Sequence, residues 1–80
     1  MGLAKSEQEI AERTSRFLKA ELKRAGLTYD DLADRLAKHG LKGETRNSIT
    51  AKLARGTFAA TFFLACLAAL EMEGLRLEDL

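Results

Sequence analysis

The side chains best suited to bind a charged partner lie between residues 38 and 56, where positive charge is concentrated. This segment carries five basic residues against a single acid, Glu44. The whole chain has 13 basic and 12 acidic residues and a net charge of only +1. The positive charge is therefore a local feature of this segment and not a property of the whole chain. A local cationic patch is typical of surfaces that bind nucleic-acid phosphates, although the net charge by itself indicates no such partner.

Residues 45–55 have the pattern of a short helix with a small, polar outer face. If Ile49 and Leu53 face inward, the step of about 100° per residue turns Asn47 and Ala51 outward. Asparagine pairs with adenine in the major groove of DNA, serine and threonine bond either base edge, and methyl groups contact thymine. The same face is typical of an ordinary solvated helix, and a register shift of one residue would change which groups face outward. The residues predicted to contact bases are Thr45, Arg46, Asn47, Ser48, Thr50 and Ala51.

Basic residues flank this face and are predicted to contact DNA phosphates, which position a protein without reading sequence. Arg16, Lys19 and Lys23 fall on one face of the first predicted helix and would extend the contact. The phosphate contacts predicted on this basis are Arg16, Lys19, Lys38, Lys42, Lys52 and Arg55.

Residues that act as nucleophiles, acids or metal ligands in enzymes are few and scattered. His39 is the only histidine and Cys66 the only cysteine, so neither a disulfide nor a ligand pair of these types is expected. We interpret Cys66 as a packing residue and His39 as a solvated residue at a helix end. The three aspartates between residues 30 and 34 are interpreted as a capped, solvated helix face rather than a metal site. We therefore expect no enzyme, no metal and no cofactor.

Composition predicts one small globular domain over residues 1–80, of which residues 1–8 are expected to be flexible. Apolar residues make up 46% of the chain and charged residues 31%. The longest apolar run, residues 58–70, is shorter than the roughly 18 residues that indicate a membrane span. The chain after Met1 lacks the basic and apolar regions of a signal peptide. We expect a cytoplasmic protein with no membrane partner.

Caps and glycines divide the chain into helices, and no proline interrupts them. Ser6 with Glu9 and Thr28 with Asp31 have the spacing of helix starts. The predicted helices run from the Ser6 cap to Gly26, from the Thr28 cap to about Gly40, over residues 45–55, and over residues 58–71. The predicted fold class is therefore all-α, a compact bundle of four to five helices with a long turn between the second and third.

The predicted fourth helix, capped by Thr57, is apolar around nearly its whole circumference. Such a helix must be covered on all sides, by the rest of the chain and by a partner or a second copy. The predicted interface residues are Phe58, Phe62 and Phe63. After this helix, Leu75, Leu77 and Leu80 are expected to pin a short final turn to the core.

The order of these segments resembles the lambda-repressor-like, XRE-type helix-turn-helix domain. Residues 27–36 resemble the entry to its second helix, residues 48–56 its recognition helix with a terminal Arg-Gly, residues 63–70 its fourth helix and residues 74–80 its closing segment. The resemblance implies a five-helix fold, DNA binding through the third helix, frequent dimerisation and a role in transcriptional control. The chain also resembles a family of small bacterial proteins described only as a domain of unknown function, which share its Arg-Gly-Thr-Phe and Phe-Phe-Leu elements.

Three departures from the XRE pattern stand out. Tyr29 occupies the position where that domain often has a phosphate-binding glutamine, and its hydroxyl is predicted to substitute as a phosphate contact. The turn over residues 37–43 is longer than usual, and this connection sets how the recognition helix enters the groove. Ile49 and Leu53 are four residues apart where the domain more often has three. The orientation of the third helix relative to DNA therefore does not follow from the resemblance.

Two functions are compatible with these patterns. The first is a dimeric, DNA-binding transcriptional regulator whose partner is double-stranded DNA. The alternative is a non-catalytic protein-interaction module, such as an antitoxin, an anti-activator or an accessory subunit, that keeps the fold without binding DNA. The near-neutral charge, the long turn and the apolar excess near Phe58 favour the alternative.

Overall fold

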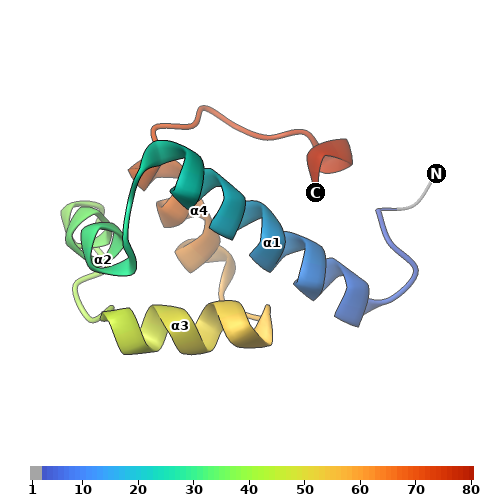
Figure 1. Ribbon diagram of the computed structural model, residues 1–80, viewed down its shortest axis with the longest axis horizontal. Coiled ribbons are helices and arrows are strands. Elements are labelled where there is room, and N and C mark those ends of the chain that lie inside the picture. The colour runs from blue at the N-terminus through green and yellow to red at the C-terminus, as the bar shows by residue number, and fades with distance from the viewer. Residues whose placement is uncertain (1–2) are drawn as a thin grey trace.

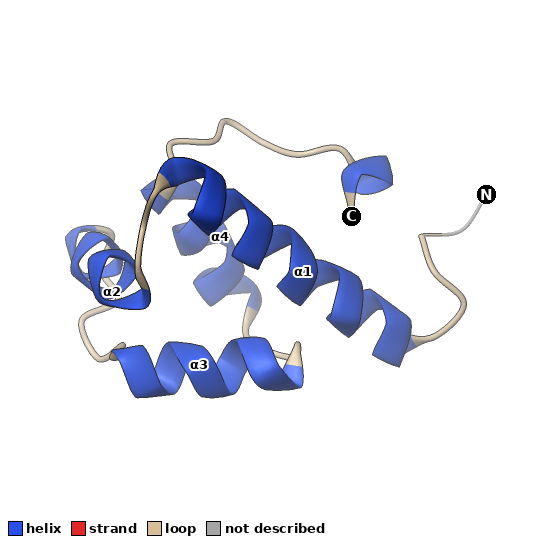
Figure 2. Cartoon of the chain, viewed as in Figure 1, coloured by secondary structure: helices blue, strands red, loops and turns tan. Residues whose placement is uncertain are grey.

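The computed structural model describes residues 3–80 and contains, within them, four α-helices and a short 3-10 helix. In chain order they are α1 (Glu7–Ala25), α2 (Tyr29–Lys38), α3 (Arg46–Arg55), α4 (Ala60–Ala69) and η1 (Leu77–Asp79), as Figure 1 shows. No strand occurs in this part of the chain (Figure 2). The predicted all-α class is therefore confirmed. Of the residues expected to be flexible, 1 and 2 lie outside the described part, and α1 already begins at Glu7.

Local hydrogen bonds set the starts of the first three helices. The Ser6 hydroxyl accepts a bond from the third residue of α1, at 3.1 Å. At the start of α2, Asp31 N donates to Thr28 Oγ1 at 3.1 Å and Thr28 N donates to Asp31 Oδ2 at 3.0 Å. Thr45 and Ser48 exchange the same reciprocal bonds at the start of α3. Such caps satisfy N–H groups that have no partner inside the helix, so these starts are encoded locally.

The fourth helix is shorter than the predicted residues 58–71, and Thr57 is not its cap. It begins at Ala60, with Ala59 as the N-cap, and alanine has no side-chain acceptor to offer. Phe58 stays in the preceding loop, where its ring lies 5.1 Å from that of Phe62. At the other end, Arg35 Nη1 donates to the carbonyl oxygen of Ala69 at 2.9 Å. Tertiary contacts thus set the length of α4.

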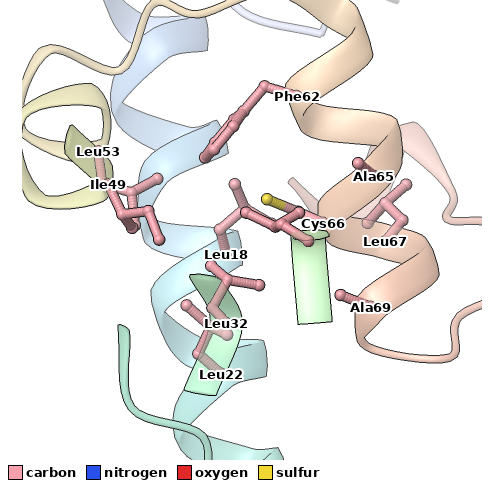
Figure 3. Close-up of a cluster of buried hydrophobic side chains, with 11 residues drawn as sticks. Leu18, Leu22, Leu32, Ile49, Leu53, Phe62, Ala65, Cys66, Leu67 and Ala69 are labelled. Carbon is pink, nitrogen blue, oxygen red and sulfur yellow. The ribbon is translucent and has the colours of Figure 1, made fainter. Parts of the chain in front are cut away.

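The buried side chains come from all four helices and meet at the centre of the molecule (Figure 3). Ile49 and Leu53 of α3 are 0% and 2% exposed, which confirms that they face inward. In the closing segment Leu75 packs on this core, but Leu77 is 65% exposed and does not pin the final turn. The main members of the core are Leu18, Leu22, Leu32, Leu36, Ile49, Leu53, Phe62, Cys66, Leu67 and Ala69.

The C-terminal end of α3 is fixed closely against α1. The buried Ser15 Oγ donates to the carbonyl oxygen of Leu53 at 2.7 Å. Gly56, the C-cap of α3, has a φ of 75°, and a Cβ at this position would lie 2.6 Å from the carbonyl oxygen of Ala11. Only glycine combines this left-handed conformation with so close an approach. This contact joins one end of α3 to the longest helix of the fold.

Within residues 3–80, no single helix has both the length and the apolar character needed to cross a membrane. Helices α3 and α4 meet that criterion only when taken together, and they are bent by 117° relative to each other.

Replacing Gly56 with alanine is expected to destabilise the fold more than the same change at Gly26. Both glycines are left-handed, with φ of 75° and 72°, where alanine costs about 1–2 kcal/mol. At Gly56 the added methyl group would also collide with α1, whereas in the described chain the space around the Cβ position of Gly26 is open. Urea denaturation should show a larger fall in the free energy of unfolding for Gly56→Ala. Equal losses of unfolding free energy in the two variants would mean that α1 and α3 can move apart at Gly56 without destabilising the fold, which would contradict this prediction.

Candidate nucleic-acid interface

The face of α3 that points away from the core is small and polar. Asn47, Thr50 and Ala51 are exposed on it, as the inward positions of Ile49 and Leu53 require, and Arg46 is exposed at the N-terminal end of the helix. Thr50 is exposed, and its Oγ1 donates to the carbonyl oxygen of Arg46 at 2.8 Å. No residue of α3 is acidic. The helix therefore presents short side chains and positive charge to the outside.

Ser48, also predicted as a base contact, is turned toward the start of α3 rather than to this outer face. The side chain is half-buried, and its Oγ donates to Glu44 Oε1 at 2.8 Å while it accepts from Thr45 N at 2.8 Å. Thr45 is exposed, but its own hydroxyl accepts from Ser48 N at 3.1 Å. Both hydroxyls thus serve to start α3. Both were predicted as base contacts, although the spacing of Thr45 and Ser48 is that of a helix start.

Lys52, which was predicted to contact phosphate, is paired with Glu44 on the inner side of α3. Its Nζ lies 2.9 Å from both carboxylate oxygens of Glu44 and 5.3 Å from the centre of the Phe62 ring. The lysine and glutamate side chains are only 26% and 14% exposed. Burial tends to raise the pKa of Glu44, but hydrogen bonds from Lys52 and Ser48 outweigh it and hold that pKa below its usual value. The only acid of the basic segment is therefore neutralised on the inner side.

The long connection between α2 and α3 is held at both ends. Seven residues, 39–45, separate the two helices. Near its beginning, Leu41 N donates to the carbonyl oxygen of Leu36 at 3.0 Å and the Leu41 side chain packs on the core. Near its end, Glu44 is tied to Lys52 and Ser48 of α3. The position of α3 thus depends on anchored residues rather than on a tight turn.

Basic side chains lie toward both ends of α3. At its C-terminal end, Arg55 lines a shallow groove together with Arg16 and Lys19 of α1, so the structure brings these three predicted phosphate contacts together. Glu12 also lines this groove. At the other end, Lys38 and Lys42 are exposed in α2 and the connection. Positive charge therefore comes from α1 and α3 at the C-terminal end of α3, and from α2 and the α2–α3 connection at its N-terminal end.

Tyr29, a predicted phosphate contact, is partly interior. It begins α2, and its half-buried ring packs against the core. This packing accounts for the aromatic residue at a site where a glutamine was the expected type.

The predicted interface residues divide between core and surface. Phe62 is 2% exposed and belongs to the core, so its prediction as an interface residue is wrong. Phe58 and Phe63 are half-buried, with ring centres 6.3 Å apart. Sequence reasoning missed Leu64, which is 63% exposed on α4. Because α4 is apolar all round, no polar stripe marked the side that the rest of the chain leaves uncovered.

A family model described as Domain of unknown function (DUF6471) matches residues 10–75. The chain belongs to the DUF6471 family. The matched part of this DUF6471 chain includes most of α1 and all of α2, α3 and α4. The expected membership in a domain-of-unknown-function family is thereby confirmed. No curated protein and no solved structure is significantly similar to the chain.

The groups with catalytic potential in this DUF6471 domain are dispersed or buried. Among residues 3–80, no three His, Cys, Asp or Glu side chains are arranged to hold a metal ion. Cys66 is 1% exposed, and burial, assisted by the negative charge of Glu44, raises the pKa of its thiol to about 12. A thiol that stays protonated at neutral pH is a poor nucleophile. Cys66 therefore acts as a core residue.

The Glu44–Lys52 pair gives the stability of the fold a specific pH dependence. We expect Glu44→Gln to lower the free energy of unfolding at neutral pH by about 1–3 kcal/mol, because Lys52 loses its charged partner. The folded-state pKa of Glu44 is depressed, so its contribution is complete above the unfolded-state value of 4.5 and is lost as pH falls through the folded-state value. The stabilities of wild type and variant should therefore converge in acid.

Urea denaturation between about pH 7 and about pH 3 measures this convergence. Asp31, whose pKa is also lowered, by hydrogen bonds with Thr28, is the same in both proteins, so its contribution cancels in the difference. Glu73→Gln, a change at an exposed glutamate, is the control and should leave stability nearly unchanged at every pH. A stability difference between wild type and Glu44→Gln that stays constant into acid would contradict the assignment.

Proposed function

We propose that this DUF6471 protein is a non-catalytic regulator that binds double-stranded DNA by inserting α3 into the major groove. The observation that carries the proposal is the outer face of α3, which combines small polar side chains with a complete lack of acids. Glu44, the one carboxylate of the segment, is turned inward and paired with Lys52. A face of this kind meets the negative potential of the groove without repulsion.

The size of the side chains suits close approach to the bases. A major groove about 12 Å wide admits an α-helix, provided that the side chains between backbone and base edges are short. Thr50, Ala51 and Ala54 meet this requirement, since all three are exposed and small. Asn47 and Arg46 then have the reach and the donors to read adenine and guanine respectively.

Phosphate contacts on both sides of the groove would hold α3 in place. Arg16, Lys19 and Arg55 would contact one strand from the α1–α3 side, and Lys38 and Lys42 the other strand from the α2–α3 connection. Helix α3 has no acid in its first turn, so its positive N-terminal end also favours an anion. The resemblance of the chain to XRE-type domains supports the same role for the third helix and a role in transcriptional control.

A second candidate function is a protein-interaction module, and the exposed Leu64 favours it. This leucine lies on α4 next to the half-buried Phe63, while the DNA-facing side chains proposed above belong to α3. A contiguous exposed apolar patch is typical of a surface covered by another protein, and Leu64 would form such a patch together with Phe63. For the DNA-binding regulator, the same face would serve the homodimer that the XRE resemblance implies. For an antitoxin, anti-activator or accessory subunit, it would hold the partner.

Selection from a random duplex library, followed by fluorescence anisotropy over a series of salt concentrations, tests DNA binding. We expect Asn47→Ala to relax the preference at one base position, at a cost of about 1–3 kcal/mol. We expect Lys42→Gln to weaken binding to all sequences and to reduce the salt slope by about one. Both effects follow from the separate roles of base and phosphate contacts.

Arg76→Gln is the matched control for the loss of one positive charge. The closing segment that contains Arg76 lies on the side of α1 away from α3 (Figure 1), so affinity should not change. If the wild type binds no duplex even at a low salt concentration of about 50 mM, the DNA-binding proposal is wrong.

The oligomeric state tests the role of Leu64. We expect size-exclusion chromatography with light scattering to give the mass of a dimer for the wild type and of a monomer for Leu64→Glu. The matched control is Leu77→Glu, because Leu77 is equally exposed, at 65%, but lies in η1 rather than α4. A monomeric wild type, or dissociation by both variants alike, would count against a dimer through α4.

A further inference from the structure

An ion pair joins the first turns of α2 and α3 on the outer surface. Arg46 Nε donates to Asp30 Oδ2 at 3.1 Å, and Arg46 Nη2 contacts the same oxygen. The arginine and aspartate side chains are 68% and 55% exposed. The pair connects the proposed recognition helix to the helix before it, at the point where α3 would enter the groove.

Each partner is held by a locally determined backbone position. Asp30 lies between Thr28 and Asp31, whose reciprocal hydrogen bonds fix the start of α2. Arg46 lies in the same way between Thr45 and Ser48 at the start of α3. The two capped turns therefore present the carboxylate and the guanidinium to each other from rigid supports.

Stability does not explain why arginine occupies this position. Exposed ion pairs contribute only about 0–1 kcal/mol. A cation in the first turn is also unfavourable, because the N-terminal end of a helix carries partial positive charge. The first turns of α1 and α2 follow the favourable pattern and carry acids, whereas α3 carries Arg46. The exception lies at the N-terminal end of the helix that is proposed to meet DNA.

The geometry of the pair leaves one particular edge of the guanidinium available. Asp30 takes the edge formed by Nε and Nη2, so the edge formed by Nη1 and Nη2 keeps two parallel N–H donors that point away from the side chain. Guanine offers two acceptors, O6 and N7, at matching positions in the major groove. Adenine offers one acceptor and one donor there, so it does not match.

The charge of Asp30 has a second consequence. Arg46 is neutralised locally by its partner, which reduces its attraction to phosphates in general. Its free edge still offers hydrogen bonds to a base. The pair thus converts a residue that would otherwise increase affinity for any DNA into one that discriminates between bases.

We propose that Asp30 is a positioning residue for base recognition, which holds Arg46 so that its free N–H edge selects guanine at one position of the DNA site. This inference rests on the proposed function, since it requires that α3 enter the major groove.

The test compares duplexes that carry guanine or adenine at the position whose preference is lost in Arg46→Ala. For Asp30→Asn, we expect the preference for guanine to fall by about 5-fold or more, the range over which such a bidentate contact discriminates. We also expect affinity for unrelated duplexes to rise and the salt slope to increase by about one, because Arg46 regains its full attraction to phosphate. Asp30→Glu keeps the carboxylate and should retain the guanine preference.

Asp34→Asn is the matched control, because Asp34 is an exposed acid one turn further along α2. This variant removes the same charge and should raise affinity for unrelated duplexes while leaving the guanine preference intact. A wild type that binds no duplex overturns the proposed function and this inference together. A wild type that binds with a sequence preference that Asp30→Asn leaves unchanged overturns this inference alone.

Discussion

The structure depends on how a ten-residue helix, α3, is held against the core by only two buried side chains. Ile49 and Leu53 each contribute about 1.5–3 kcal/mol through burial, and an isolated helix of this length is marginal in water. Polar contacts at the two ends supply the remaining constraint. At the N-terminal end, Glu44 bonds Lys52 and Ser48, and at the C-terminal end Ser15 bonds the carbonyl of Leu53 beside Gly56. The side chains on the outer face of α3 are therefore not needed for packing.

These end contacts also determine the charge of the surface. Glu44 and Lys52 neutralise each other on the inner side, so α3 itself presents no acid on its outer face. At the start of α3, Asp30 pairs with Arg46, while Arg55 lies with Arg16 and Lys19 at the other end. A protein with a net charge of only +1 thereby gains a cationic face suited to the proposed DNA contact.

Helix α4 has a different role, since it carries the core on one side and an apolar surface on the other. Phe62 and Cys66 face inward, and Leu64 faces solvent. The two proposed binding surfaces therefore lie on different helices, which meet at an angle of 117°. DNA and a second copy of the chain would occupy separate faces, so the DUF6471 domain has room for both partners.

Local patterns in the sequence determined the starts of the first three helices, the ends marked by Gly26 and Gly56 and the inward direction of Ile49 and Leu53. These features depend on neighbours within four residues, which a single sequence displays directly. The membership of Asn47, Thr50 and Ala51 in the outer face followed from the same periodicity.

Only the tertiary structure decided the roles of Ser48, Lys52 and Phe62 and the length of α4. The pairing of Lys52 with Glu44 spans eight residues, and that of Arg46 with Asp30 spans sixteen. Spacing within one helix does not predict such contacts, because they depend on how separate helices and their connection pack. Helix α4 shows the same limit: a helix that is apolar on every side does not show in its sequence which side the core will cover.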